Sequence, residues 1–225
     1  MGVSVMRSVR IWFTKKDTAK YISHLDLTRC LIRAFRRTDI PLWYTEGFNP
    51  HPHLVFGLSL PLGVEGENEI LDIRLDDESY KNERVLSELN RVTVPGIEFL
   101  KIEAPQNKPL LITSGLYEMV ISSNNGENIK NAILEKIDSK NILIQKKTKK
   151  GEIKEINVSE HLTEFKIIKE LENELHFSFI LPAGNDFTIN PIMFKDALIA
   201  DFAPENISWS IVRKNLLIKD GTEFR

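Results

Sequence analysis

The chain has 225 residues, of which 42% are hydrophobic and 28% charged, and its net charge is −2. These values are typical of a soluble globular protein with one or two domains. The single cysteine, Cys30, excludes an internal disulfide, a four-cysteine zinc site and an iron–sulfur cluster ligated by this chain alone. No run of about 18 apolar residues is present, so we expect no membrane helix and a cytoplasmic location.

The charge is unevenly divided along the chain. Residues 1–37 carry nine lysines and arginines against two aspartates, or +7, whereas the remainder carries −9. A chain polarised in this way can present a positive surface to a polyanion and still be soluble as a whole.

Residues 7–14 alternate in polarity and predict a half-buried strand. Val9, Ile11 and Phe13 would face a core, and Arg10 and Trp12 would share the other face. An aromatic ring beside an arginine on an open sheet can stack a nucleic-acid base. The alternative is that Trp12 packs beneath a second layer.

A helix is predicted to begin after Ser23, an N-cap residue with Asp26 three positions later. Its core stripe comprises Leu27, Leu31, Ala34 and Phe35. The opposite face carries four arginines, Arg29, Arg33, Arg36 and Arg37. Arginine suits bidentate phosphate contacts, so this face is a candidate nucleic-acid surface. The alternative is a solvated face neutralised by acidic side chains from the rest of the chain.

Short strands are predicted at residues 42–44 and 54–60, on either side of the loop TEGFNPHPH. Its prolines restrict the backbone and would hold His51 and His53 in a fixed relation. A strand at 69–75, a helix at 78–92 and a strand at 97–103 follow. This order is the βαββαβ pattern of a ferredoxin-like unit.

The second half repeats the theme loosely. Strands are predicted at 116–122, 164–170, 175–181 and 208–218, with helices over 126–139 and 189–202 and a hairpin over 142–158. The hairpin tip is basic, with Lys146, Lys147, Lys149 and Lys150, and is either a solubilising turn or a finger that reaches a nucleic-acid backbone. We therefore predict an α+β chain of two tandem ferredoxin-like units with antiparallel sheets and helices on one face. The units are residues 1–105 and 114–225, joined by a linker at 106–113.

The histidines allow two kinds of chemistry. His24, His51 and His53 could supply three nitrogen ligands to a metal ion. Alternatively, His24, Tyr44 and His51 could act as general acids and bases in metal-free RNA cleavage. A histidine at a helix start would tend to stay neutral, and simple packing of His24 at the sheet edge remains open. No phosphate loop, dinucleotide fingerprint or nucleophile elbow is present, and Cys30 reads as a structural thiol.

The run SHLDL, followed by GFNPHP, resembles the signature of the bacterial radical-SAM-linked domain family, whose own role is uncharacterised. The strongest likeness covers about residues 8–75. The resemblance implies a radical-SAM protein as partner and gives this chain an accessory role, because the radical chemistry needs a cysteine-ligated cluster.

We therefore expect a non-catalytic RNA-binding module that works with a radical-SAM enzyme on tRNA or rRNA and carries no cofactor itself. The expected RNA contacts are Arg10, Trp12, Arg29, Arg33, Arg36, Arg37, Phe48, His51 and His53. An enzyme centred on the histidines, with or without a metal, and a protein-interaction scaffold are the alternatives.

Overall fold

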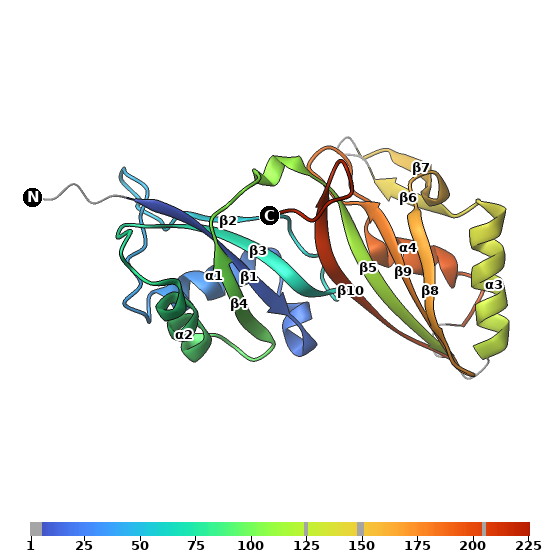
Figure 1. Ribbon diagram of the computed structural model, residues 1–225. Helices are drawn as coiled ribbons and strands as arrows, with labels where there is room; N and C mark the ends of the chain where they lie inside the picture. The colour runs from blue at the N-terminus through green and yellow to red at the C-terminus, as the bar shows by residue number, and fades with distance from the viewer. Residues whose placement is uncertain (1–5, 124–125, 148–150, 204–205) are drawn as a thin grey trace, which may run out of the picture. The chain divides into compact units, whose positions relative to one another are not determined.

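The computed structural model describes residues 6–123, 126–147, 151–203 and 206–225. The chain divides into two compact units, which we call unit 1 (Met1–Ile112 with Glu223–Arg225) and unit 2 (Thr113–Thr222). The described part of the chain has four α-helices and mainly antiparallel sheet, which confirms the predicted α+β class (Figure 1). No helix in these ranges is long and apolar enough to cross a membrane.

The helices and strands of unit 1 follow the predicted order, except that the predicted strand at 42–44 is reduced to isolated bridges at Leu42 and Tyr44. Its elements are β1 (Arg7–Lys15), the 3-10 helix η1 (Asp17–Tyr21), α1 (His24–Phe35), β2 (Leu54–Phe56), β3 (Glu65–Leu75), α2 (Asn82–Val92) and β4 (Ile97–Glu103). Within the unit the strands are ordered β4-β1-β3-β2, and each neighbouring pair is antiparallel.

The core of unit 1 lies between one face of this sheet and the two helices (Figure 1). Val9, Ile11 and Phe13 of β1 point into it, as the alternation predicts. The apolar stripe of α1 covers these residues through Leu27 and Leu31, both at most 4% exposed. The alternate residues of β1 and β3, such as Arg10 and Asp72, therefore lie on the second face of the sheet.

The start of α1 confirms the predicted cap. Ser23 has an extended backbone, its Oγ accepts a hydrogen bond from the Asp26 amide, and it donates one to the Asp26 carboxylate over 2.7 Å. This arrangement satisfies an amide that the first helical turn leaves unpaired. The cap fixes where the helix begins and therefore which side chains face the sheet.

Unit 2 contains β5 (Ile112–Ser123), α3 (Gly126–Ser139), β6 (Leu143–Lys147), β7 (Ile153–Asn157), the 3-10 helix η3 (Val158–Glu160), β8 (Thr163–Glu170), β9 (Glu174–Pro182), α4 (Pro191–Leu198) and β10 (Ile207–Ile218). Its main sheet has the order β10-β5-β9-β8, and β6 and β7 form a separate antiparallel hairpin. Without that hairpin, the order is the same as in unit 1: fourth, first, third, second.

The core of unit 2 is rich in phenylalanine. Phe177 and Phe179 of β9 are fully buried, and Phe179 meets Phe194 of α4 with 4.9 Å between ring centroids. Tyr117 of β5 stacks on Phe179 from the neighbouring strand at 5.6 Å. Aromatic residues of the adjacent strands β5 and β9 therefore form this core, and Phe179 joins it to α4.

The division of the chain differs from the predicted one in two places: residues 106–112 of the predicted linker and residues 223–225 both belong to unit 1. Gln106 and Asn107 donate backbone hydrogen bonds to the Arg225 carbonyl, and a short 3-10 helix, η2 (Pro109–Leu111), precedes β5. Phe224 is 2% exposed. Residues 223–225 therefore belong with unit 1, although the predicted boundary placed them in the second unit.

Candidate functional site

A row of three arginines runs along the solvent side of α1. Arg29, Arg33 and Arg36 are all exposed, and they lie opposite the buried stripe of the helix. Arg29 has a local partner in Asp26, at 3.3 Å. Among the described residues, neither Arg33 nor Arg36 has an acidic side chain within salt-bridge distance. We call these three residues the arginine row.

Arg37, the fourth predicted member of this face, has a different role. Its guanidinium donates a hydrogen bond to the carbonyl of Val92, the last residue of α2. Helix ends leave carbonyl groups unpaired, and a cation there is favourable. Arg37 therefore ties α1 to α2.

The loop predicted between residues 44 and 54 is a narrow hairpin, which we call the 43–53 hairpin. Thr45 donates a backbone hydrogen bond to His51 over 2.9 Å, and His53 donates one to Trp43 over 3.2 Å. The Thr45 hydroxyl also lies 3.0 Å from Nδ1 of His51. Phe48, at the tip, is fully exposed. The hairpin thus holds His51 in place and presents Phe48 to solvent.

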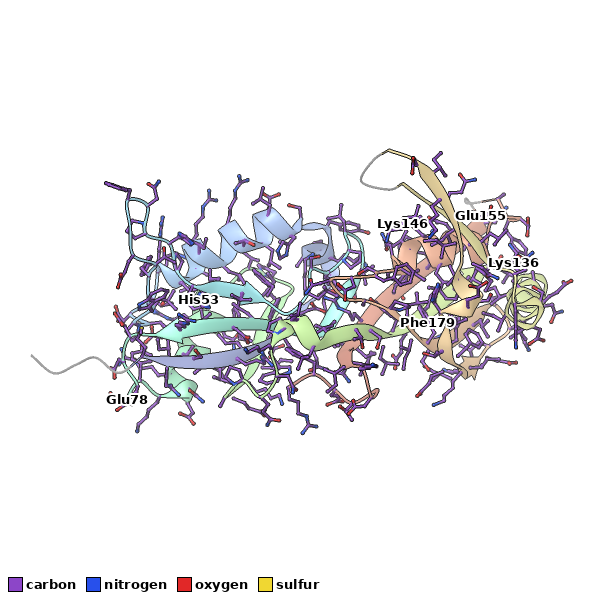
Figure 2. The ribbon with its side chains drawn as sticks, turned by 90° about the horizontal axis from the view of Figure 1, so that it is seen from above. His53, Glu78, Lys136, Lys146, Glu155 and Phe179 are labelled. Atoms are coloured by element: carbon purple, nitrogen blue, oxygen red, sulfur yellow. The ribbon has the colours of Figure 1, made fainter. Side chains whose placement is uncertain are left out.

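Three side chains meet where this hairpin joins β3, and we call them the Trp43 cluster: Trp43, His53 and Arg74. The rings of Trp43 and His53 lie 6.0 Å apart at 68°, and the Arg74 guanidinium lies 5.3 Å from the centre of the indole. All three side chains are half-buried. Figure 2 shows His53 beside the strands of unit 1. Partial burial, and then the charge of Arg74, hold the pKa of His53 below its ordinary value of 6.5.

His24 lies in different surroundings. Its ring meets Phe56 edge-on at 4.8 Å, on the helix side of the sheet. Burial, and then the ammonium of the buried Lys15, lower its pKa from 6.5. His53, by contrast, adjoins Arg74, which alternates with the core residue Ile73 and so lies on the opposite face.

The histidines therefore do not gather into one centre. Among the residues that the structure describes, which include His24, His51 and His53, no group of three His, Cys, Asp or Glu side chains could hold a metal ion. The predicted acid–base set is also dispersed: Tyr44 alternates to the other side of the 43–53 hairpin from Thr45 and His51. The structure does not bring together the side chains that either enzymatic alternative requires.

Arg10 and Trp12 correct a prediction, because neither is available to a nucleic acid in this structure. Arg10 is 0% exposed: both carboxylate oxygens of Asp72 accept from it at 2.7 Å, and the Phe224 ring lies 4.1 Å from its guanidinium. Trp12 is 5% exposed, with the Lys101 ammonium 4.2 Å from its ring centre. The alternation correctly placed them on the second face but could not reveal that this face is covered at Arg10 and Trp12.

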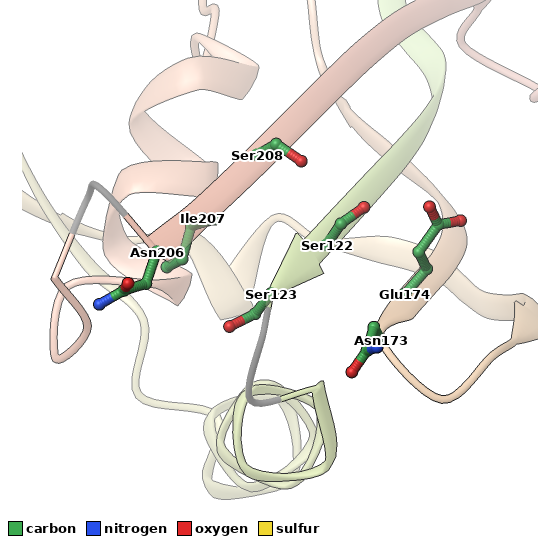
Figure 3. A pocket seen from close by; sticks show the side chains of 7 residues that line it. All are labelled: Ser122, Ser123, Asn173, Glu174, Asn206, Ile207 and Ser208. Carbon is green, nitrogen blue, oxygen red and sulfur yellow. The ribbon is translucent and has the colours of Figure 1, made fainter.

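Two cavities are lined by described residues of unit 2. One, of about 270 Å³, lies where β5 ends and β9 and β10 begin, and hydroxyl, amide and carboxylate groups dominate its lining (Figure 3). Its residues are Ser122, Ser123, Asn173, Glu174, Asn206, Ile207 and Ser208. The other, of about 500 Å³, adjoins the β6–β7 hairpin and includes His161 and Phe187, whose rings are 4.8 Å apart. Neither was predicted from the sequence.

The basic hairpin tip is only partly described. Lys146 donates a hydrogen bond to the Thr188 carbonyl over 2.8 Å and lies over the Phe187 ring, so its ammonium is held against unit 2. Lys149 and Lys150 lie outside the described residues, as does the tip itself.

Two members of the Trp43 cluster were missed by the sequence analysis. Trp43 stood in a short predicted strand and Arg74 in another, about 30 residues apart. The backbone hydrogen bond from Trp43 to the Arg74 carbonyl, at 2.9 Å, brings them together. The sequence signal that could have revealed Trp43 is its closeness along the chain to His51 and His53 of the GFNPHPH segment.

Comparison with known proteins gives one family and several distant structures. The model of the family described as "Uncharacterized protein conserved in bacteria (DUF2344)" matches residues 8–191. No curated protein matches the sequence.

Among solved structures, a chain of a Cbf5-Nop10-Gar1 complex is 9% identical with a TM-score of 0.47, over 92% of this chain and 48% of that one. An unknown protein from Galdieria sulphuraria is 9% identical with a TM-score of 0.27, over 92% and 98% of the two chains. A putative glycine cleavage system transcriptional repressor is 10% identical with a TM-score of 0.26, over 96% and 100%. The present chain spans about half the length of the first of these, and at such TM-scores the likeness carries no argument.

Proposed function

The chain belongs to the DUF2344 family of uncharacterized proteins conserved in bacteria, and we propose that this member is a non-catalytic RNA-binding module. The observation that carries the proposal is the arginine row of α1. Like charges three or four positions apart on a helix are neighbours and repel one another, and here Arg33 and Arg36 have no acidic partner among the described residues. A polyanion bound along the helix would relieve that repulsion, and guanidinium groups match phosphate oxygens bidentately.

We propose tRNA or rRNA as that polyanion, in the cytoplasm, with a radical-SAM enzyme as the working partner. The partner is supported by the resemblance of the SHLDL and GFNPHP segments to the radical-SAM-linked signature. With one cysteine, the chain alone cannot ligate a four-iron cluster, so the radical chemistry would belong to the partner. The role of this chain would be to recruit or position the RNA.

We also infer that both units are ferredoxin-like. In each, the strands take the order fourth, first, third, second, and a helix follows the first strand and the third. The β6–β7 hairpin would then be an insertion in the second unit, between its first helix and its second strand.

The test is the salt dependence of RNA binding, measured by fluorescence anisotropy with labelled tRNA. Each phosphate neutralised on a single strand contributes about 0.7 log unit of affinity per log unit of salt, and somewhat more on a duplex. We expect the variant Arg33→Ala/Arg36→Ala to bind more weakly and to lose about 1.4 from that slope, if each guanidinium contacts one phosphate.

The matched control is Lys166→Ala/Lys169→Ala, which removes the same charge from exposed positions of β8 in unit 2. It should bind as the wild type does. Equal binding by the arginine variant and the wild type would overturn the assignment of the arginine row. A wild-type protein that binds no cellular RNA at low salt would overturn the proposed function as a whole.

A further inference from the structure

We propose that the Trp43 cluster is a stacking site for one unpaired nucleobase, so that the preferred ligand is single-stranded RNA. This inference rests on the proposed RNA binding and specifies the form of RNA that binds. It concerns residues on the opposite face of the unit 1 sheet from the arginine row, so the two surfaces can be tested separately.

The geometry of the cluster suits stacking. The indole of Trp43 is half-buried, with His53 meeting it at 68° and Arg74 over its ring. The backbone of Trp43 is hydrogen-bonded on both sides, to Arg74 of β3 and to His53 across the hairpin. An aromatic side chain fixed before binding loses little conformational freedom when a base stacks on it.

The charges around the indole suit a nucleotide. Asp72 of β3, whose charge acts on His53, already accepts from Arg10 through both oxygens. Among the described residues, no carboxylate lies within ion-pair distance of Arg74, so its guanidinium is free to donate to a base edge or a phosphate. Proteins that bind single-stranded nucleic acids combine a positively charged group with an aromatic ring in this way.

Only an unpaired base can use such a site. In an RNA duplex the bases are stacked on their neighbours, and an indole on the protein surface cannot reach their faces. Phe48, fully exposed at the tip of the same hairpin, offers a second ring for a neighbouring base. The hairpin therefore favours loops and unpaired ends over helical segments.

The experiment compares one labelled 12-nucleotide single strand with its duplex, by anisotropy, for the wild type and Trp43→Ala. Base–aromatic stacking contributes about 1–3 kcal/mol, so we expect at least a fivefold loss for the single strand and none for the duplex. Trp43→Phe, which keeps a ring, should retain most of the affinity. Trp209→Ala is the matched control, because Trp209 in unit 2 also has a cation over its ring, the Lys195 ammonium at 4.5 Å.

A second measurement decides the matter if Trp43→Ala does not fold. In Trp209→Phe, Trp43 is the remaining indole with solvent exposure, because Trp12 is buried. Single-stranded RNA should quench its fluorescence, and duplex RNA should not.

The two proposals fail in different ways. The stacking site would be overturned if Trp43→Ala bound the single strand as the wild type does. It would also be overturned if single-stranded RNA did not quench the Trp43 fluorescence, even if the arginine variant still loses affinity. That result would also be expected if the cluster contacted a protein partner. Loss of all RNA binding by the wild type would instead overturn the proposed function.

Discussion

At the scale of single residues, the environment of His53 combines burial with a cation. The imidazole is partly buried beside Trp43, and Arg74 adds a positive charge that disfavours protonation. Asp72 acts in the opposite direction, and His51 adds to the effect of Arg74. Because the pKa in the folded protein is lower than in the unfolded chain, the unfolded chain binds the proton first. The free energy of unfolding should therefore fall as the pH drops through 6.5 toward the folded pKa, and level off below it.

Replacing Arg74 by alanine should raise the pKa of His53, because the second-largest cause of its depression is removed while burial remains. NMR titration of the His53 ring protons measures this directly. Arg91→Ala, at an exposed position on α2, is the control and should leave the midpoint unchanged. An unaltered midpoint in Arg74→Ala would show that the guanidinium does not act on this histidine.

The sequence indicated which residues lie on the face of the unit 1 sheet opposite the helices, but not which of them are buried by other residues. Alternation assigned Arg10 and Trp12 to that face correctly, since the period of a strand is a local property. Their burial depends on Asp72, Lys101 and Phe224, which lie far along the chain. The same limit hid Arg74, whose role depends on strand register.

At the scale of elements, α1 shows how local signals decide a helix. The cap at Ser23 and the stripe through Leu27 and Leu31 were readable from spacing alone, and both are present in the structure. The 43–53 hairpin was only partly readable. Its prolines indicated a restricted loop, whereas its narrow pairing depends on hydrogen bonds such as that between Thr45 and His51.

We expect Ser23→Ala to lower the free energy of unfolding by about 1 kcal/mol, because the Asp26 amide loses its acceptor at the helix start. Urea unfolding monitored by circular dichroism measures the change. Ser87→Ala is the matched control: its hydroxyl donates to the Arg84 carbonyl within α2, and its effect should stay within about 0.5 kcal/mol. Equal effects of the two substitutions would argue against the cap.

At the scale of the whole chain, the two units share one strand order although no residue-level repeat is visible in the sequence. The order of helices and strands was predictable, because each element has its own periodicity. The packing of residues 223–225 in unit 1 could not be predicted, because three residues carry no periodic signal. Phe224 contacts Arg10, which lies more than 200 residues earlier in the chain.

Phe224→Ala should destabilise unit 1 by about 3–5 kcal/mol, because it removes a buried ring and uncovers the guanidinium of Arg10. Fluorescence unfolding in a Trp209→Phe background reports on unit 1, where Trp12 and Trp43 lie. Phe48→Ala removes the same ring from a fully exposed position and should change stability by less than about 0.5 kcal/mol. A Phe224 variant as stable as the Phe48 variant would contradict the packing described here.

The position of Phe224 also determines when unit 1 can complete its packing during synthesis on the ribosome. Domains generally fold as units while the chain emerges, the N-terminal one first. Unit 1 emerges first, but its residues 223–225 become available only after all of residues 113–222 have been translated. During that interval Arg10 would lack its aromatic cover.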